Sequence, residues 1–365
     1  MSRTDLAFGS RQRLPSSIVI STVWRILTRQ IDTNQAQDDT VLREACTQAR
    51  YGSDREPARK AMAATRGDYD RRARYVRVLA ESTAGGLGSR VDRTTGRVDT
   101  DAAWTDQWAA RAPNNPDAQL VRAHSLMSRA WEVRGGDWAS AVRPEQWAEF
   151  HRLLELAGQV NDLARHLAPE DPTPWANQLE LMIDQGASTE EIEETWRELT
   201  RLDPWHRQGH ALKLTYHCKK WGGSHEAMFD FARSVAAAAP AGSPLHVLPV
   251  CAAAEWALWE HDRESPDSTA DEIGQRWRQD PIMQSDLDNA LSLWFHQPAN
   301  RHADWLNDAN FLAYGLARTG RDADAAPVFA SIGRYMTTVP WSWWGDRVRG
   351  DAAFIRARRR ARRAA

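Results

Sequence analysis

Three histidines, His206, His210 and His217, lie along one predicted helix and fall on a single stripe of it. His206 and His210 are four residues apart, a spacing at which two side chains can hold one metal ion. His217 lies about 10.5 Å further along the axis, beyond the reach of the same ion. No Glu stands between the first pair as in zinc proteases. We therefore predict no metal and no cofactor here, and interpret the stripe as a polar face directed at a groove.

The most distinctive local sequence is Trp221-Gly222-Gly223-Ser224, which follows two lysines. Gly222 can take the left-handed conformation that ends a helix, Gly223 permits a tight reversal, and Ser224 can cap the next helix. Alternatively, the lysines and the free N–H groups after Ser224 would attract a phosphate or carboxylate. The spacing matches neither a P-loop nor a dinucleotide-binding loop, so we predict a structural turn between two helices.

Polar and aromatic residues share the predicted 205–221 helix and the turn that ends it. In stacked helical hairpins, the first helices line a concave face that can receive a peptide. We expect Trp to anchor apolar side chains there, and Lys and His to meet carboxylates or carbonyls. This predicts a non-enzymatic scaffold that binds a protein or peptide. The predicted contact residues are Trp175, His210, Lys213, His217 and Trp221.

Two other function classes stay open. A hydrolytic or metal-dependent enzyme would use the His, Asp and Glu residues of 203–226, although the chain has no Gly-x-Ser-x-Gly elbow and no catalytic residue is predicted. A nucleic-acid-associated regulatory protein would use the C-terminal tail, where six Arg fall within residues 356–363. Such a run can neutralise phosphates, but the rest of the chain shows no recognisable nucleic-acid-binding motif.

Apolar residues recur at helical spacing nearly throughout, which predicts an all-α protein. Gly186 is expected to end one helix and Ser188 to cap the next. The predicted regions are an N-terminal helical region 1–82, a Gly/Ser/Thr/Arg loop or linker 83–100, tetratricopeptide-like repeats 101–262, a polar interrupted segment 263–284, further tetratricopeptide-like helices 285–345 and an Arg-rich tail 346–365.

Prolines recur between the predicted helices at a nearly regular interval. Pro172, Pro204 and Pro240 are 32 and 36 residues apart, close to the ~34 residues of a tetratricopeptide unit. The match is degenerate, because Glu180 and Ile192 stand where that repeat favours small residues. We predict tetratricopeptide-like helical hairpins stacked as a right-handed α-solenoid.

Three short sequences, 131–135, 171–175 and 220–226, resemble a group of uncharacterised actinobacterial tetratricopeptide-like proteins. That group is related to a bacterial domain of unknown function with a Trp-Gly-Gly-Ser motif. The likeness extends over roughly residues 60–335, and only the Trp-Gly-Gly-Ser segment is specific. The resemblance implies a bacterial, cytosolic, all-helical protein and carries over no activity.

The composition is that of a folded globular chain without a membrane span. The chain has 365 residues, a mean hydropathy of −0.62 and no apolar run of the ~20 residues that cross a bilayer. Three widely separated cysteines, Cys46, Cys218 and Cys251, favour a reducing, cytoplasmic location. The 18 Trp are interpreted as wedges between helices or as the lining of an apolar groove.

Overall fold

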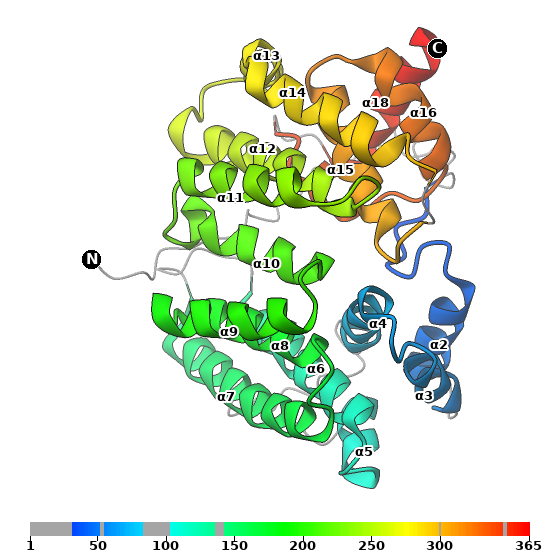
Figure 1. Ribbon diagram of the computed structural model, residues 1–365, viewed down its shortest axis with the longest axis vertical. Helices are drawn as coiled ribbons and strands as arrows, with labels where there is room; N and C mark the ends of the chain where they lie inside the picture. Colours follow the sequence, from blue (N-terminus) through cyan, green and yellow to red (C-terminus); the bar gives the residue numbers. More distant parts are fainter. Residues whose placement is uncertain (1–30, 52–54, 83–102, 136–141, 299–300, 346–348) are drawn as a thin grey trace, which may run out of the picture. The chain divides into compact units, whose positions relative to one another are not determined.

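The computed structural model describes residues 31–51, 55–82, 103–135, 142–298, 301–345 and 349–365 (Figure 1). Within these residues the chain is helical, and its β-structure is limited to one isolated bridge between Asp32 and Tyr335. The all-α prediction is therefore confirmed for the described part of the chain. The predicted loop 83–100 lies outside the described residues.

The described chain divides into two compact units. We call residues 39–213 the N-terminal unit, and residues 31–38 with 214–365 the C-terminal unit. The division falls inside the predicted 101–262 array. The N-terminal unit holds α2 (Thr40–Tyr51), α3 (Glu56–Ala63), α4 (Tyr69–Glu81), α5 (Trp104–Arg111), α6 (Pro116–Arg134), α7 (Pro144–Leu167), α8 (Thr173–Gln185), α9 (Thr189–Leu202) and most of α10 (Arg207–His217).

From α5 to α9 each helix of the N-terminal unit contacts the next, and α7 contacts both α6 and α8 (Figure 1). Phe150 and Leu153 of α7 are buried with Leu126 of α6 in one apolar cluster. The predicted end of α8 and the predicted cap of α9 are confirmed. Gly186 has a φ of +68°, and Ser188 accepts a hydrogen bond from the Glu191 N–H. Helices α4, α6 and α8 also contact one another, which brings three non-consecutive helices together.

Buried ion pairs connect these helices. Arg72 of α4 donates to Asp117 of α6 at 2.6 Å and also to Asp171, two residues before the start of α8. Arg129 of α6 donates to both carboxylate oxygens of Asp106 of α5, each at 2.9 Å. Because a buried charge is costly without a partner, these contacts fix the register of the helices.

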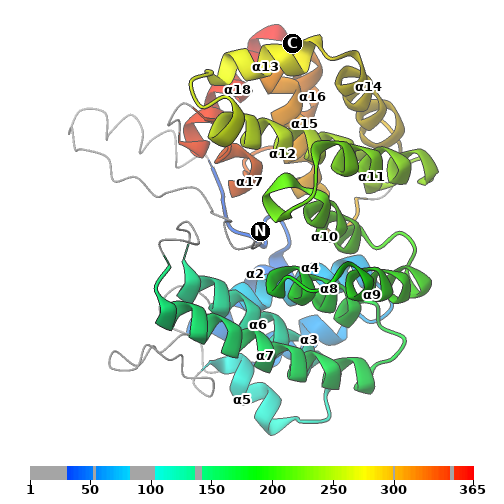
Figure 2. The same cartoon turned by 90° about the vertical axis from the view of Figure 1, so that its left-hand side faces the viewer.

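The C-terminal unit surrounds an almost entirely apolar helix. Its elements are η2 (Lys219–Trp221), α11 (His225–Ala238), η3 (Pro244–Val247), α12 (Leu248–Trp259), η4 (Glu260–Glu264), α13 (Ala270–Gln279), α14 (Pro281–Ala290), η5 (Leu291–Phe295), α15 (Trp305–Arg318), α16 (Asp322–Ile332), α17 (Thr338–Trp341) and α18 (Gly350–Ala364). Helix α12 is buried along most of its length, and α15 contacts both α12 and α16 (Figure 2).

Tryptophans wedge between the helices of this unit. Trp277 and Trp341 are fully buried, and Tyr314 lies against both rings, with centroids 6.4 and 5.6 Å away. Trp277 belongs to α13, the short helix inside the predicted polar segment 263–284. The Arg-rich tail forms α18, whose Phe354 is also buried in the core.

Candidate functional site

The Trp-Gly-Gly-Ser segment forms the predicted turn between α10 and α11. Gly222 is left-handed, with a φ of +85°. A Cβ on Gly223 would lie 2.1 Å from the carbonyl oxygen of His217, so only glycine fits there. Ser224 caps α11 by accepting a hydrogen bond from the Ala227 N–H at 3.0 Å. The turn therefore fixes the next residue, His225, as the first residue of α11.

Both lysines that precede this turn are paired with carboxylates of their own unit. Lys220 donates to the two carboxylate oxygens of Glu255, each at 2.7 Å, and Lys219 donates to Glu264. Their charges are already balanced, which removes the main attraction for a phosphate at the turn. The anion-site alternative therefore gains no support.

Two predicted partner residues of α10 contact α9. The His210 ring packs edge-on against Trp196 with centroids 4.9 Å apart, and Lys213 pairs with Glu193. Burial lowers the pKa of His210 to about 4, so its ring is neutral at pH 7. These contacts direct both side chains into the packing between α9 and α10.

The other three predicted residues lie apart from that pair. Trp175, at the start of α8, carries the Arg165 guanidinium 4.4 Å above its ring. His217 lies 5.1 Å from the Phe231 ring, and Trp221 packs half-buried on the apolar core. Trp175, His210 and Lys213 thus belong to the N-terminal unit, whereas His217 and Trp221 belong to the C-terminal unit.

The histidine stripe is engaged with the backbone of its own helix. The Gly209 N–H donates to Nδ1 of His206 at 3.1 Å. Nδ1 of His210 lies 3.0 Å from the carbonyl oxygen of His206. One nitrogen of each ring thus contacts the backbone at the start of α10.

A cluster that the sequence did not single out lies between α6 and α8. His124 Nδ1 is 3.4 Å from Asn177 Oδ1 and 3.9 Å from Glu180 Oε2. One turn further along α8, Asp184 accepts a 2.8 Å hydrogen bond from the Trp131 indole N–H. We call His124, Asn177, Glu180 and Asp184 the acidic cluster. Its α8 members are spaced three and four apart, which places them on one face of the helix.

The acidic cluster contains polar atoms without partners. Glu180 Oε2 and Asn177 Nδ2 are shielded from solvent and make no hydrogen bond to any described residue. The Glu180 side chain as a whole is 28% exposed, so the cluster reaches the surface of its unit. A buried carboxylate oxygen that lacks a donor costs roughly 1–3 kcal/mol, and a suitable ligand would remove that cost.

Burial also changes the charge of the cluster. It raises the pKa of Glu180 to about 7, although Arg77 of α4 opposes the shift. The pKa of Asp184 is raised well above its ordinary value by burial and by the neighbouring Glu180 charge. Burial lowers the pKa of His124, which leaves that ring neutral at pH 7. Both carboxyl groups thus hold their protons to a higher pH than ordinary carboxyls, and an added cation would relieve the repulsion between their charged forms.

One sequence signal pointed toward this cluster. Glu180 occupies a position where the tetratricopeptide pattern favours a small residue, and a polar residue that breaks a packing rule often marks a functional site. The partners of Glu180 could not be predicted, because His124 comes from a helix more than 50 residues earlier in the chain.

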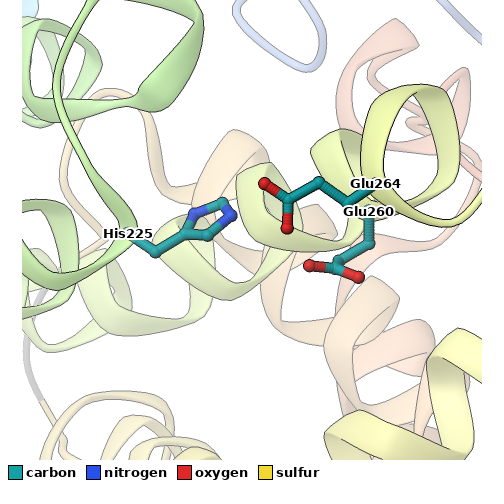
Figure 3. Close-up of side chains that lie close together, drawn as sticks. All are labelled: His225, Glu260 and Glu264. Atoms are coloured by element: carbon teal, nitrogen blue, oxygen red, sulfur yellow. The ribbon is translucent and has the colours of Figure 1, made fainter.

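A separate group in the C-terminal unit has donor atoms of the kind that hold metals. One ligand atom each of His225, Glu260 and Glu264 lies within 4.8 Å of the others (Figure 3). His225 is the first residue of α11, and Glu260 and Glu264 belong to η4. The range 203–226 of the enzyme alternative includes His225 but neither glutamate, because Glu260 and Glu264 come from a later segment of the chain.

Part of the Arg-rich tail is used in folding. Arg358 donates to the carbonyl oxygen of Gly333 at 2.9 Å. Arg360 donates to Asp322 at 3.2 Å and to the carbonyl oxygen of Ala317 at 3.1 Å. These contacts attach α18 to its own unit, so at least two of the arginines serve the fold.

Comparisons with protein-family models, with curated proteins and with solved structures gave no match to this chain. Among the helices in the described ranges, none combines the length and the apolar character required to cross a membrane.

Proposed function

We propose that the chain is a bacterial, cytoplasmic scaffold of degenerate tetratricopeptide-like hairpins, stacked as a right-handed α-solenoid, that binds a protein or peptide partner. In this proposal the acidic cluster of the N-terminal unit takes a basic side chain of the partner. The arrangement of α4, α6 and α8 supports it, because contacts among alternate helices are what a stack of hairpins requires.

The observation that carries the proposal is the solvent-shielded Glu180 Oε2, which no described residue hydrogen-bonds. Lys and Arg side chains have only donors, so they match a carboxylate oxygen that lacks one. A cation would also reduce the repulsion between Glu180 and Asp184, which stand one turn apart on α8. An anionic partner would meet the same repulsion and is disfavoured.

Asn177 adds a reason to expect a peptide. Its Nδ2 is also shielded and without a hydrogen-bond partner among the described residues, and it is a donor. A ligand that satisfies both groups must offer a cation and a carbonyl oxygen close together. A peptide segment with a lysine or arginine provides both, from its side chain and its main chain.

The test measures the affinity of short labelled peptides by fluorescence anisotropy. The probes are hexapeptides that differ only in a central Lys, Arg or Glu. We expect the full chain to favour Lys or Arg, and Glu180→Gln to weaken that binding about tenfold or more, as the loss of a charged hydrogen bond does. Glu190→Gln, on the exposed start of α9, serves as the matched control.

Equal affinity of the wild type and Glu180→Gln for the basic peptides would contradict the proposal. An equally strong response to the Glu190 control would contradict it too, since it would reduce the effect to the overall negative charge of the chain. Salt titration distinguishes binding at the shielded Glu180 from a general attraction to exposed negative charge, because exposed charges are screened more strongly than shielded ones.

The partner residues predicted from the sequence remain a separate hypothesis. Trp175 and Lys213 belong to the same unit as the acidic cluster, so a partner bound at Glu180 can be tested for contact with them. If Trp175 takes part, Trp175→Ala weakens peptide binding while the unit stays folded. The measurement is the same anisotropy titration, with helix content checked by circular dichroism.

A further inference from the structure

We propose that the C-terminal unit binds one divalent transition-metal ion between α11 and η4, with His225, Glu260 and Glu264 as its ligands. This site is independent of the acidic cluster, which lies in the other unit. Three features of the structure support this site: the convergence of the donors, the ring nitrogens of His225 without hydrogen-bond partners, and the way each glutamate is held.

The three donors converge from two elements that meet. Figure 3 shows the His225 ring directed toward the carboxylates of Glu260 and Glu264. One donor atom from each residue lies within 4.8 Å of the others, a spread that a single ion can close with small side-chain movements. Glu260 is 6% exposed, so one ligand is already withdrawn from water.

His225 has ring nitrogens that nothing else uses. Both are shielded from solvent, and neither makes a hydrogen bond to a described residue. Shielded ring nitrogens without partners are costly, and a metal ion would satisfy one of them.

Each glutamate is held through one oxygen and leaves the other open. Oε2 of Glu260 accepts from Arg276 at 2.7 Å and from Ser265 at 3.3 Å. Oε1 of Glu264 accepts from Trp259 at 3.0 Å and from Lys219. Oε1 of Glu260 and Oε2 of Glu264 accept no hydrogen bond from the described residues. Metal-binding carboxylates are commonly oriented in this way, by hydrogen bonds to the oxygen that does not bind the ion.

The backbone that presents the glutamates is itself unusual. Glu260–Glu264 is a π-helical turn that continues α12, and the Ser265 N–H donates to the Glu260 carbonyl oxygen at 2.7 Å. Such turns are rare inside helices and are frequent at functional sites. Here the turn carries both glutamates, four residues apart, toward the start of α11.

The ligand set indicates the class of ion. One imidazole nitrogen and two carboxylate oxygens suit Zn²⁺ or Mn²⁺, and three protein ligands leave a position for water. Lys219 is the main competitor, because its ammonium already neutralises Glu264. That pair is solvent-exposed, at 30% for Lys219 and 43% for Glu264, and exposed ion pairs are weak enough for a divalent ion to displace.

The experiment is equilibrium dialysis of the full chain against Zn²⁺ and Mn²⁺, with bound metal measured by mass spectrometry. We expect about one ion per chain for at least one of the two metals. His225→Asn and Glu264→Gln should each weaken binding by at least about tenfold, whereas Lys219→Met should tighten it by up to about fivefold. His296→Asn, an exposed histidine of the same unit, is the control and should change nothing.

The opposite sign expected for Lys219→Met keeps the test informative even if a ligand variant folds poorly, since misfolding does not tighten binding. The Co²⁺-loaded chain gives a second readout, because its visible spectrum reports nitrogen and oxygen ligands and should change in His225→Asn. Fewer than one ion per chain for both metals, or binding undiminished in both ligand variants, would overturn the proposal.

Discussion

Replacing Glu180 by glutamine tests whether the acidic cluster is as strained as its burial indicates. Burial raises the pKa of Glu180 from 4.5 to about 7 in the folded chain. A carboxyl whose folded pKa is raised stabilises the fold fully below its unfolded pKa, and this contribution is lost as the pH rises through the folded pKa. Glutamine cannot ionise, so we expect Glu180→Gln to gain stability relative to the wild type between pH 5 and pH 8.

The magnitude follows from the same pKa. A rise from 4.5 to about 7 corresponds to an upper limit of about 3 kcal/mol in the free energy of unfolding. The side chain is 28% exposed, and Asp184 shares the titration, so we reduce the expected relative gain to about 1–2 kcal/mol. Arg77 and Glu81 of α4 and His124 of α6 complete the charged and titratable surroundings.

The assay is urea unfolding at pH 5 and pH 8. Unfolding is monitored by pulsed hydrogen exchange with mass spectrometry of peptides from α6 and α8. These peptides report on the N-terminal unit alone, whereas the fluorescence of 18 Trp would mix both units. Glu190→Gln is the control and should shift stability equally at the two pH values. An unchanged difference between wild type and Glu180→Gln at pH 5 and pH 8 would refute the account of the cluster.

Two further predictions concern the fold. Gly223→Ala should destabilise the C-terminal unit by about 2–3 kcal/mol, because the new Cβ would collide with the His217 carbonyl. The Cβ of Gly158→Ala in α7 would meet no atom within 4 Å, so this variant should stabilise the N-terminal unit by about 0.5–1 kcal/mol. Thermal unfolding measures both changes, and a similar change in the two variants would contradict the turn geometry. Arg72→Met should cost about 3–5 kcal/mol, because it removes the buried ion-pair partner that Asp117 and Asp171 share and leaves Asp117 paired with the exposed Arg66. Arg66→Met, at a 63% exposed side chain, should cost less than about 1 kcal/mol. Equal losses in urea unfolding would show that the buried network does not hold α4.

The local signals in the sequence were reliable where they depended on backbone chemistry. Gly186, Ser188, Gly222 and Ser224 end or begin helices as predicted, because left-handed glycines and hydroxyl caps act within a few residues. Within the polar segment 263–284, Ile273 and Trp277 permit one short helix, and they are the buried face of α13 together with Ala270 and Gly274.

The candidate sites were harder to predict, because they are formed by packing between distant segments. His225 and Glu264 are 39 residues apart, and their convergence requires both the glycine turn and the π-helical turn. The stripe of His206 and His210 looked more like a site in the sequence, but both rings contact the backbone of their own helix. Spacing along one helix could not reveal which side chains another helix would cover.

The most direct test of the proposed function is the number of protons exchanged when a lysine-containing peptide binds. Calorimetry at pH 6.5, in two buffers of different ionisation enthalpy, measures it. A cation bound at Glu180 and Asp184 favours their ionised forms, so we predict release of up to about one proton by the wild type and clearly fewer by Glu180→Gln. Binding with no proton release, or with the same release in both proteins, would contradict the claim that this cluster receives the partner.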